Sequence, residues 1–215
     1  DKVDGFLLDR GFQVLLTAYP EARRLLNYPA LKLRTFSPGA LIRMDGKFHR
    51  ISDPFRQPWT LPATLFSTVG NFKDKLRIAR LRRHVLAGSI EEIFQRPETS
   101  SLDALLEFGF SDRIIGSFFR PFFGGIFLEN DLATSSRMLE FIFRMFSQGK
   151  AALPAAGMGA IPQQLAARLP AGTLRLGARV ESLGEGEVHV KGGERIPAVA
   201  VVLAVAGPWY LWVGL

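Results

Sequence analysis

Residues 154–162 read Pro-Ala-Ala-Gly-Met-Gly-Ala-Ile-Pro, and the character of the chain changes at this stretch. Before it, apolar residues recur at the three- and four-residue spacing of amphipathic helices. After it, a short helix is predicted over 163–169, and strands are predicted over 173–176, 178–183, 187–191 and 199–205. The last strand is a continuous apolar run, which is typical of a strand covered on both faces. We therefore expect an α/β or α+β fold with a helix-rich middle.

The chain upstream of that middle favours strands and turns. Residues 5–12 predict a short strand that ends in a glycine turn, and residues 19–26 predict a short helix. Residues 40–44 and 47–51 flank Asp45-Gly46, a dipeptide that reaches positive φ easily and suits a type I′ turn. The sequence therefore predicts a β-hairpin at this position.

Several consecutive helices are predicted between residues 72 and 148. The first covers 72–94 with a possible division at Gly88-Ser89, and the last carries apolar residues from 139 to 146. The predicted buried stripe of the first helix consists of Phe72, Leu76, Ala79, Leu86, Ile90 and Ile93.

Local capping signals define the helices in between. Ser100 is expected to begin a helix that Gly109 ends, and Ser111 is expected to begin the next one. That helix is expected to end at Pro121, because proline lacks the N–H that continues a helix. Residues 122–127 are then expected to form an aromatic, glycine-bearing loop.

Composition excludes several classes of site. The chain has 215 residues, of which 47% are hydrophobic, so it is long and apolar enough to bury a core. It has no cysteine, which excludes disulfides, iron–sulfur clusters and thiolate zinc sites. His49, His84 and His189 are far apart and lack metal-ligand spacing, so no metal site is expected.

The net charge of +7 comes mainly from arginines before residue 150. Such a charge favours nucleic acid, an anionic membrane surface or an acidic ligand, and charge alone does not choose among them. No nucleic-acid module is recognisable, so we expect no nucleic-acid partner. The sequence has no apolar run of membrane-spanning length and no signal-peptide pattern at its start, so we expect a cytoplasmic or peripheral membrane protein. The most basic helix face carries Lys73, Lys75, Arg77, Arg80, Arg82 and Arg83, for which a solvated surface is the first interpretation and contact with anionic lipid the second.

The order of segments resembles the flavin-containing amine oxidase and carotenoid desaturase superfamily, which is related to the protoporphyrinogen oxidases. Residues 4–15 are similar to the family segment G-[FY]-x-x-D-x-G-x-x-x-L, and residues 154–162 are similar to its P-x-G-G-M turn, with Ala156 in place of the first glycine. A helix, a strand with Val180, an antiparallel excursion and an apolar strand follow in the order that the family has.

The resemblance implies a helical substrate domain, residues 21–150, inserted between partial strands of a Rossmann-like FAD-binding domain, residues 1–20 and 151–215. By the same resemblance, Asp9 and Gly11 lie near the flavin, and the backbone of Val180 lies against the adenine of FAD. Two family features are missing from this sequence: the G-x-G-x-x-G loop that approaches the pyrophosphate, and the C-terminal G-D segment. We therefore expect an internal fragment that binds FAD weakly or not at all.

The resemblance implies hydride transfer from a substrate to flavin, which fits the lack of a recognisable acid–base pair or nucleophile, so the catalytic residues stay unknown. Phe122, Phe123 and Phe127 are predicted to line the substrate site, although plain core packing is the first interpretation of the phenylalanine cluster. Arg120 could orient a polar end of the substrate or make a structural ion pair. A phenylalanine-lined site would favour a polyene or a tetrapyrrole over a polar amine.

Two alternatives from other classes stay open. The chain could be a non-catalytic module that docks on a membrane or a protein, or a carrier of lipid or carotenoid on the same scaffold. The sequence does not identify the substrate, the electron acceptor or the oligomeric state.

Overall fold

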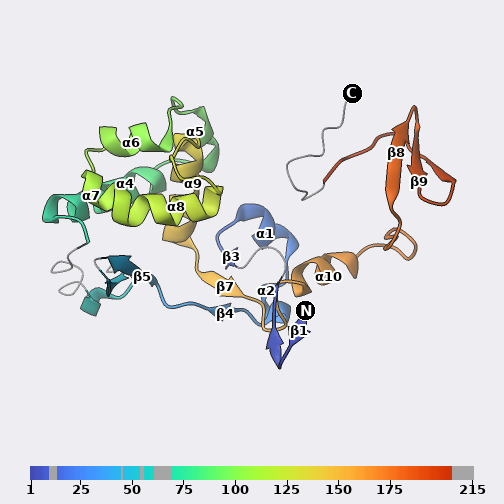
Figure 1. The fold of residues 1–215 in the computed structure, drawn as a ribbon, viewed down its shortest axis with the longest axis horizontal. Helices are drawn as coiled ribbons and strands as arrows, with labels where there is room; N and C mark the ends of the chain where they lie inside the picture. Colours follow the sequence, from blue (N-terminus) through green and yellow to red (C-terminus); the bar gives the residue numbers. More distant parts are fainter. Residues whose placement is uncertain (10–13, 45, 54–55, 61–68, 205–215) are drawn as a thin grey trace. The chain divides into compact units, whose positions relative to one another are not determined.

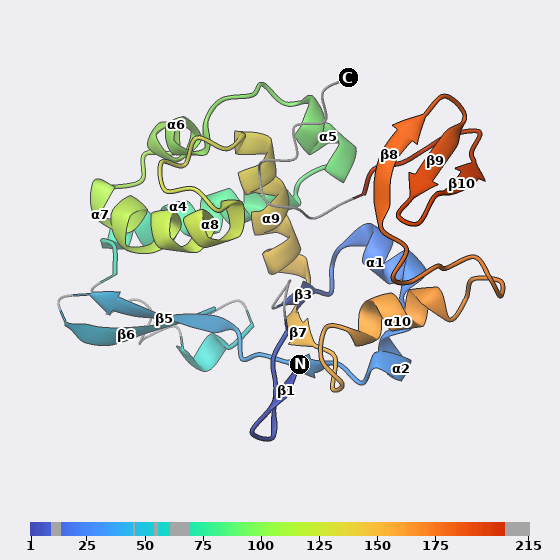
Figure 2. The same ribbon diagram turned by 45° about the vertical axis from the view of Figure 1, so that its right-hand side comes forward.

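The computed structural model describes residues 1–9, 14–44, 46–53, 56–60 and 69–204 (Figure 1). The chain forms two compact units, Asp1–Ala167 and Arg168–Leu215. Both contain short strands, and the first also contains the helix-rich middle (Figure 2). The α+β composition expected from the sequence is therefore confirmed.

The first unit alternates small strand pairs with helices. Its strands are β1 Lys2–Val3, β2 Phe6–Leu7, β3 Leu15–Leu16, β4 Arg34–Thr35, β5 Gly39–Met44, β6 Lys47–Ser52 and β7 Ala151–Leu153. Its helices are α1 Pro20–Leu25, α2 Tyr28–Leu31, η1 Pro58–Thr60, α4 Phe72–Leu86, α5 Ile90–Gln95, α6 Ser101–Glu107, α7 Asp112–Ile114, η2 Ile115–Phe119, α8 Arg120–Phe127, α9 Ser136–Gln148 and α10 Ala160–Ala166.

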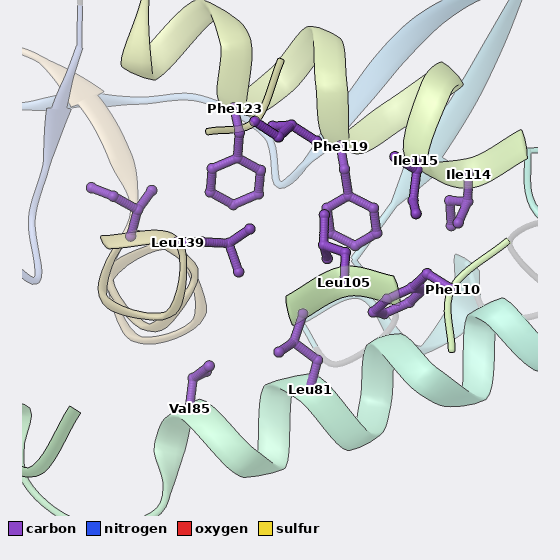
Figure 3. Close-up of a cluster of buried hydrophobic side chains, with 11 residues drawn as sticks. Leu81, Val85, Leu105, Phe110, Ile114, Ile115, Phe119, Phe123 and Leu139 are labelled. Atoms are coloured by element: carbon purple, nitrogen blue, oxygen red, sulfur yellow. The ribbon is translucent and has the colours of Figure 1, made fainter. Parts of the chain in front are cut away.

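The hydrophobic core of this unit lies among α4, α6, η2, α8 and α9. Figure 3 shows Leu81 and Val85 of α4 facing Leu105, Phe119 and other side chains of the surrounding helices. All four of these residues have no solvent-exposed surface. Burying each large apolar side chain contributes on the order of 2 kcal/mol, so this cluster is the main source of the unit's stability.

Helix α4 turns a different face inward from the one that the sequence predicts. Phe72 and Leu76 are 60% and 57% exposed, whereas Asp74 and Leu81 are fully buried, so the predicted stripe is wrong at its N-terminal end. The physical reason is the side chain of Asp74, which bonds to Asn71 and to the distant Ser111 and thereby fixes the rotation of the helix.

The predicted caps of the middle helices are confirmed. Gly88 has φ +70°, and Ser89 accepts a hydrogen bond from the N–H of Glu92, so α4 and α5 are separate helices. Ser100 caps α6 in the same way, and Ser111 caps α7. Local chemistry therefore fixes these boundaries.

The helix does not end at Pro121, and the predicted loop over 122–127 is wrong. Residues Ile115–Phe119 form a π-helical turn in which the N–H of Arg120 donates to the carbonyl of Ile115, five residues earlier. The wider turn lies directly before Pro121, and the helical backbone continues through the proline into α8 without a break.

The strands of the first unit form three small antiparallel sheets. In one of them, the central strand β7 pairs with β3 on one side and β4 on the other. The predicted hairpin is confirmed as β5–β6, and Met44 pairs with Lys47, so its loop has two residues. Asp45 of that loop lies outside the described residues.

The second unit contains one antiparallel sheet with the strands β8 Val180–Gly184, β9 Glu187–Val190 and β10 Glu194–Pro197. The predicted strand over 173–176 is not formed, and residues 198–204 are not in a strand either. Val199 and Val202 are largely exposed, because no neighbouring strand pairs with this segment among the described residues. All strand pairs in the described part of the chain are antiparallel, so the Rossmann-like arrangement and its domain boundaries stay predictions.

Candidate functional site

Two segments that the sequence singles out meet in the structure. The backbone N–H of Met158 donates a hydrogen bond of 3.1 Å to Oδ1 of Asp9, across 149 positions of the chain. Gly157 is buried beside them at φ +83°, and a Cβ atom there would lie 2.4 Å from Cδ2 of Leu7. The backbone angle favours glycine at this position, and a larger residue would also require the side chain of Leu7 to move. We call this meeting of residues 7–9 with the turn 154–159 the junction.

Strand β7 brings the turn to the junction. The N–H of Thr17 donates to the carbonyl of Lys150, and the N–H of Lys150 donates to the hydroxyl of Thr17. The two ends of the helix-rich middle therefore lie side by side. The sheet continues into the turn, where the N–H of Ala155 donates to the carbonyl of Leu31.

Helix α10 leaves the turn and is fixed against the start of α2. The side-chain amide of Gln164 donates to the backbone carbonyl of Asn27 at 3.1 Å and accepts from the N–H of Asn27 at 2.8 Å. A glutamine that bonds both groups of one residue holds the two backbones in register. The junction is thus held from both sides of the turn.

The three predicted cofactor residues have different outcomes. Asp9 lies at the junction, as described, and Gly11 lies outside the described residues. Val180 is the first residue of β8 in the second unit, where it pairs with Val190 and is 51% exposed. Their roles toward FAD stay predictions.

The junction turn differs from the phosphate-binding part of a flavin site. A pyrophosphate needs backbone N–H groups that point outward from a glycine-rich loop. Here the Met158 N–H is bonded to Asp9, and Leu7 lies where the side chain of residue 157 would be. This turn therefore binds a second segment of the same chain. If FAD is bound, we expect it to pass along the junction without being held there by its phosphates.

The predicted substrate residues belong to a continuous group of phenylalanine rings. Phe123 is fully buried in the core, with ring centroids 5.2 Å from Phe122 and 5.5 Å from Phe127. Phe122 and Phe127 are partly exposed, and Phe122 also stacks on Phe118 at 5.5 Å. Phe123 therefore has a packing role, and Phe122 and Phe127 keep ring surface that could contact a ligand.

Arg120 has a structural partner. Its guanidinium donates to the backbone carbonyl of Asn130, which lies beyond the end of α8. The same loop approaches Gly124, where a Cβ atom would lie 2.7 Å from the carbonyl oxygen of Glu129. Arg120 thus fixes the loop after α8, and its role toward a substrate stays a prediction.

Sequence reasoning missed the buried carboxylate of Asp74. It accepts hydrogen bonds from the hydroxyl of Ser111 at 2.6 Å and from the N–H groups of Ser111 and Asn71. Burial acts to raise the pKa of Asp74, but these hydrogen bonds and nearby Arg77 outweigh it, so the pKa lies below its ordinary value. The Asn71–Asp74 spacing of a capping box was the signal that could have identified it.

A second missed group is formed by charged side chains at the C-terminus of α4. Arg144 of α9 is 8% exposed and donates to the carbonyls of Val85 at 3.0 Å and Gly88 at 2.9 Å. Next to it, Arg96 donates to Glu140, whose carboxylate lies 3.4 Å from His84. The two arginines satisfy carbonyls that the end of a helix leaves unbonded.

The second unit contains a row of bonded polar side chains on β8 and β9. The hydroxyl of Ser182 lies 2.9 Å from Nδ1 of His189, and Nε2 of His189 lies 2.7 Å from Glu187. The bond with His189, followed by the charge of Arg195, lowers the pKa of Glu187. The row is a surface feature, and alternation along β9 places Glu187 and His189 on the same face.

The described part of the chain contains no group of three or more histidine, aspartate or glutamate side chains that could hold a metal ion. None of the helices within it combines the length and the apolar content that crossing a membrane requires.

Comparison with protein families supports the interpretation of the two motifs. A model of the family described as flavin containing amine oxidoreductase matches residues 1–208. That range includes Asp9, the junction and Val180. Comparisons with curated proteins and with solved structures gave no match.

Proposed function

The chain belongs to the flavin-containing amine oxidoreductase family, and from this premise we propose that it forms the substrate-binding part of an FAD-dependent oxidoreductase. When bound, the flavin would accept a hydride from the substrate. The chain's own residues would form a wall beside the flavin and an apolar surface for the substrate.

The observation that carries this proposal is the hydrogen bond between Asp9 and Met158. It joins the two segments that resemble family motifs, although they are far apart in the sequence. Such a contact would hold the two motif segments together where the helical body joins the cofactor-binding part. Asp9 is then a positioning residue for the turn.

A hydrophobic substrate follows from the aromatic rings that keep exposed surface. Phe122 and Phe127 offer no hydrogen-bonding group, so they would bind an apolar molecule such as a polyene or a tetrapyrrole better than a polar amine. The proposed site uses these two rings and treats Phe123 as core.

The test begins with the flavin itself. The protein, expressed from its whole gene, is expected to purify yellow and to release FAD on denaturation. Anaerobic addition of an oxidisable substrate should bleach the flavin absorbance band. A colourless protein that FAD does not reconstitute would overturn the proposal.

A pair of substitutions at Asp9 tests the role of the junction. Asp9→Ala removes the acceptor for the Met158 N–H, and we expect it to weaken FAD binding about tenfold, since one hydrogen bond to a charged group contributes about 1.5 kcal/mol or more. Asp9→Asn keeps an oxygen acceptor and should bind FAD nearly as well as the wild type. Asp131→Ala, at an exposed position in the loop after α8, is the control, and its FAD affinity should not change. Equal losses of FAD affinity in Asp9→Ala and Asp9→Asn would mean that the charge of Asp9 matters, and not its hydrogen bond to the turn.

A further inference from the structure

The outer face of the β5–β6 hairpin carries two large apolar side chains and two arginines. Leu41 is 69% exposed and Phe48 is 71% exposed. Leu41 pairs with Arg50 across the strands, and Arg43 pairs with Phe48. Because alternate residues of a strand share a face, these four side chains lie together on one surface.

The opposite face of the hairpin is the one that packs on the protein. Ile42 is 9% exposed, and strand β5 contacts the π-helical turn η2. The hairpin therefore has a covered inner face and an outer face that is not part of the core. Large apolar side chains grouped on such an outer face indicate an interaction surface.

An exposed tryptophan follows the open end of the hairpin in the chain. Trp59 is 76% exposed and lies in η1, which both ribbon views place beside the hairpin (Figures 1 and 2). The N–H of Gln57 donates to the carbonyl of Asp53 at 2.9 Å, so a closed turn leads from the hairpin to η1. Tryptophan is the side chain most typical of the headgroup region of a membrane.

The charge of this region is strongly positive. Between Lys32 and Thr60 the sequence has six lysines and arginines and two acidic residues. Among the described residues, neither Arg43 nor Arg50 makes an ion pair, and the carboxylate of Asp53 lies 3.4 Å from Arg56. Exposed arginines between exposed apolar side chains complement a surface that is both apolar and anionic.

Two arginines on the basic face of α4, the other possible contact for anionic lipid, have partners within the fold. Arg77 lies 3.4 Å from the buried carboxylate of Asp74. Arg80 lies over the ring of Phe108, at 5.9 Å from its centroid. These contacts leave the hairpin as the better positioned basic and apolar surface.

We propose that the outer face of the β5–β6 hairpin, together with Trp59, docks on an anionic lipid surface. Leu41, Phe48 and Trp59 enter the headgroup region, and Arg43 and Arg50 extend their guanidinium groups to lipid phosphates. The surface does not involve the junction, so this proposal stands or falls independently of the flavin.

Vesicle binding tests the proposal. The whole protein is mixed with vesicles of phosphatidylcholine alone and with vesicles of which about a third is phosphatidylglycerol, a content that gives a negative surface potential. We expect binding to the anionic vesicles that weakens as salt is added, because salt screens the attraction. Arg43→Gln/Arg50→Gln should weaken this binding about 30-fold, since each basic residue near an anionic surface contributes about 1 kcal/mol.

The apolar side chains are tested with a matched control. Leu41→Ser/Phe48→Ser should weaken binding to anionic vesicles about tenfold or more, because the inserted apolar surface is lost. Phe6→Ser/Leu128→Ser removes the same residue types at 71% and 79% exposure from other parts of the unit, and it should bind as the wild type does. Thermal unfolding of each variant checks that it is folded. Equal losses of binding to anionic vesicles in both serine variants would overturn the proposal. A wild type that binds neither kind of vesicle would overturn it as well.

Discussion

At the scale of single residues, the decisive side chain of the helical body is a buried carboxylate. Asp74 accepts four hydrogen bonds, from Asn71, Arg77 and both donors of Ser111, and so fixes both the start of α4 and the start of α7. No apolar periodicity predicts such a residue, because its burial depends on a partner 37 positions later. The predicted apolar stripe is therefore wrong at its N-terminal end, at Phe72 and Leu76, whereas Ile93 is buried as predicted.

Asp74→Asn should lower the free energy of unfolding by about 3 kcal/mol, since it leaves buried N–H groups facing an amide without a charge. Asp112→Asn, at an exposed position in the first turn of α7, should change it by less than about 0.5 kcal/mol. Urea unfolding at neutral pH measures both values. Equal changes in the free energy of unfolding in Asp74→Asn and Asp112→Asn would show that Asp74 has no special role.

The acid dependence of stability follows from the same residue. The folded-state pKa of Asp74 lies below its ordinary value of 3.8. As the pH falls, the carboxyl group of Asp74 is therefore protonated in the unfolded chain at a higher pH than in the folded protein. Its contribution to the free energy of unfolding is lost between the ordinary pKa and the lower folded-state pKa. In Asp74→Asn this part of the acid dependence should be absent.

The junction was only partly predictable from its residues. The motif resemblance placed Asp9 near the cofactor, and the turn at 154–162 was recognised as a boundary. Their contact could not be derived from spacing, because the Met158 N–H reaches Asp9 through the pairing of β7 with distant strands. The close neighbour of Gly157, Leu7, is likewise distant in the sequence.

At the scale of elements, the backbone preferences of single residues predict most boundaries of helices and turns. The exceptions depend on contacts between distant parts of the chain. The hairpin loop, the division at Gly88 and the serine caps all follow from backbone preferences of single residues. Pro121 was misread because the π-helical turn before it removes the conflict that a proline causes. Such a turn depends on packing of the surrounding helices and has no local signal here.

At the C-terminus of α4, a side chain of another helix bonds to backbone carbonyls that the end of the helix leaves unbonded. Arg144→Met should lower the free energy of unfolding by about 3 kcal/mol, since the carbonyls of Val85 and Gly88 lose a charged donor in a buried place. Arg83→Met, at an exposed position on α4, should stay within about 0.5 kcal/mol of the wild type. Chemical denaturation compares the two. A small effect of Arg144→Met would mean that water replaces the guanidinium.

At the scale of the whole molecule, the division between the units differs from the division predicted from the sequence. The prediction places a domain boundary after residue 150, whereas the first compact unit extends to Ala167. Residues 151–167 belong to the first unit because α10 is bonded to Asn27 and the turn is bonded to Asp9. The predicted domain boundary itself stays a prediction.

Limited trypsin digestion distinguishes the two boundaries. Residues 168–177 are exposed and contain no helix or strand, so the first cuts should fall in this segment, after Arg168 or Arg175. Arg179 should be cut later, because its carbonyl accepts a hydrogen bond from the N–H of Lys191 at the start of β8. Mass spectrometry of the early fragments identifies the sites. A first cut after Lys150 would instead favour the boundary predicted from the sequence.

The bonds between Thr17 and Lys150 have an evolutionary consequence. The described chain between these residues begins and ends at neighbouring strands. A body attached in this way can be exchanged for another, or lengthened by gene recombination, while the flanking backbone keeps its course. New specificities could therefore arise by grafting, with β3 and β7 as the fixed points of attachment.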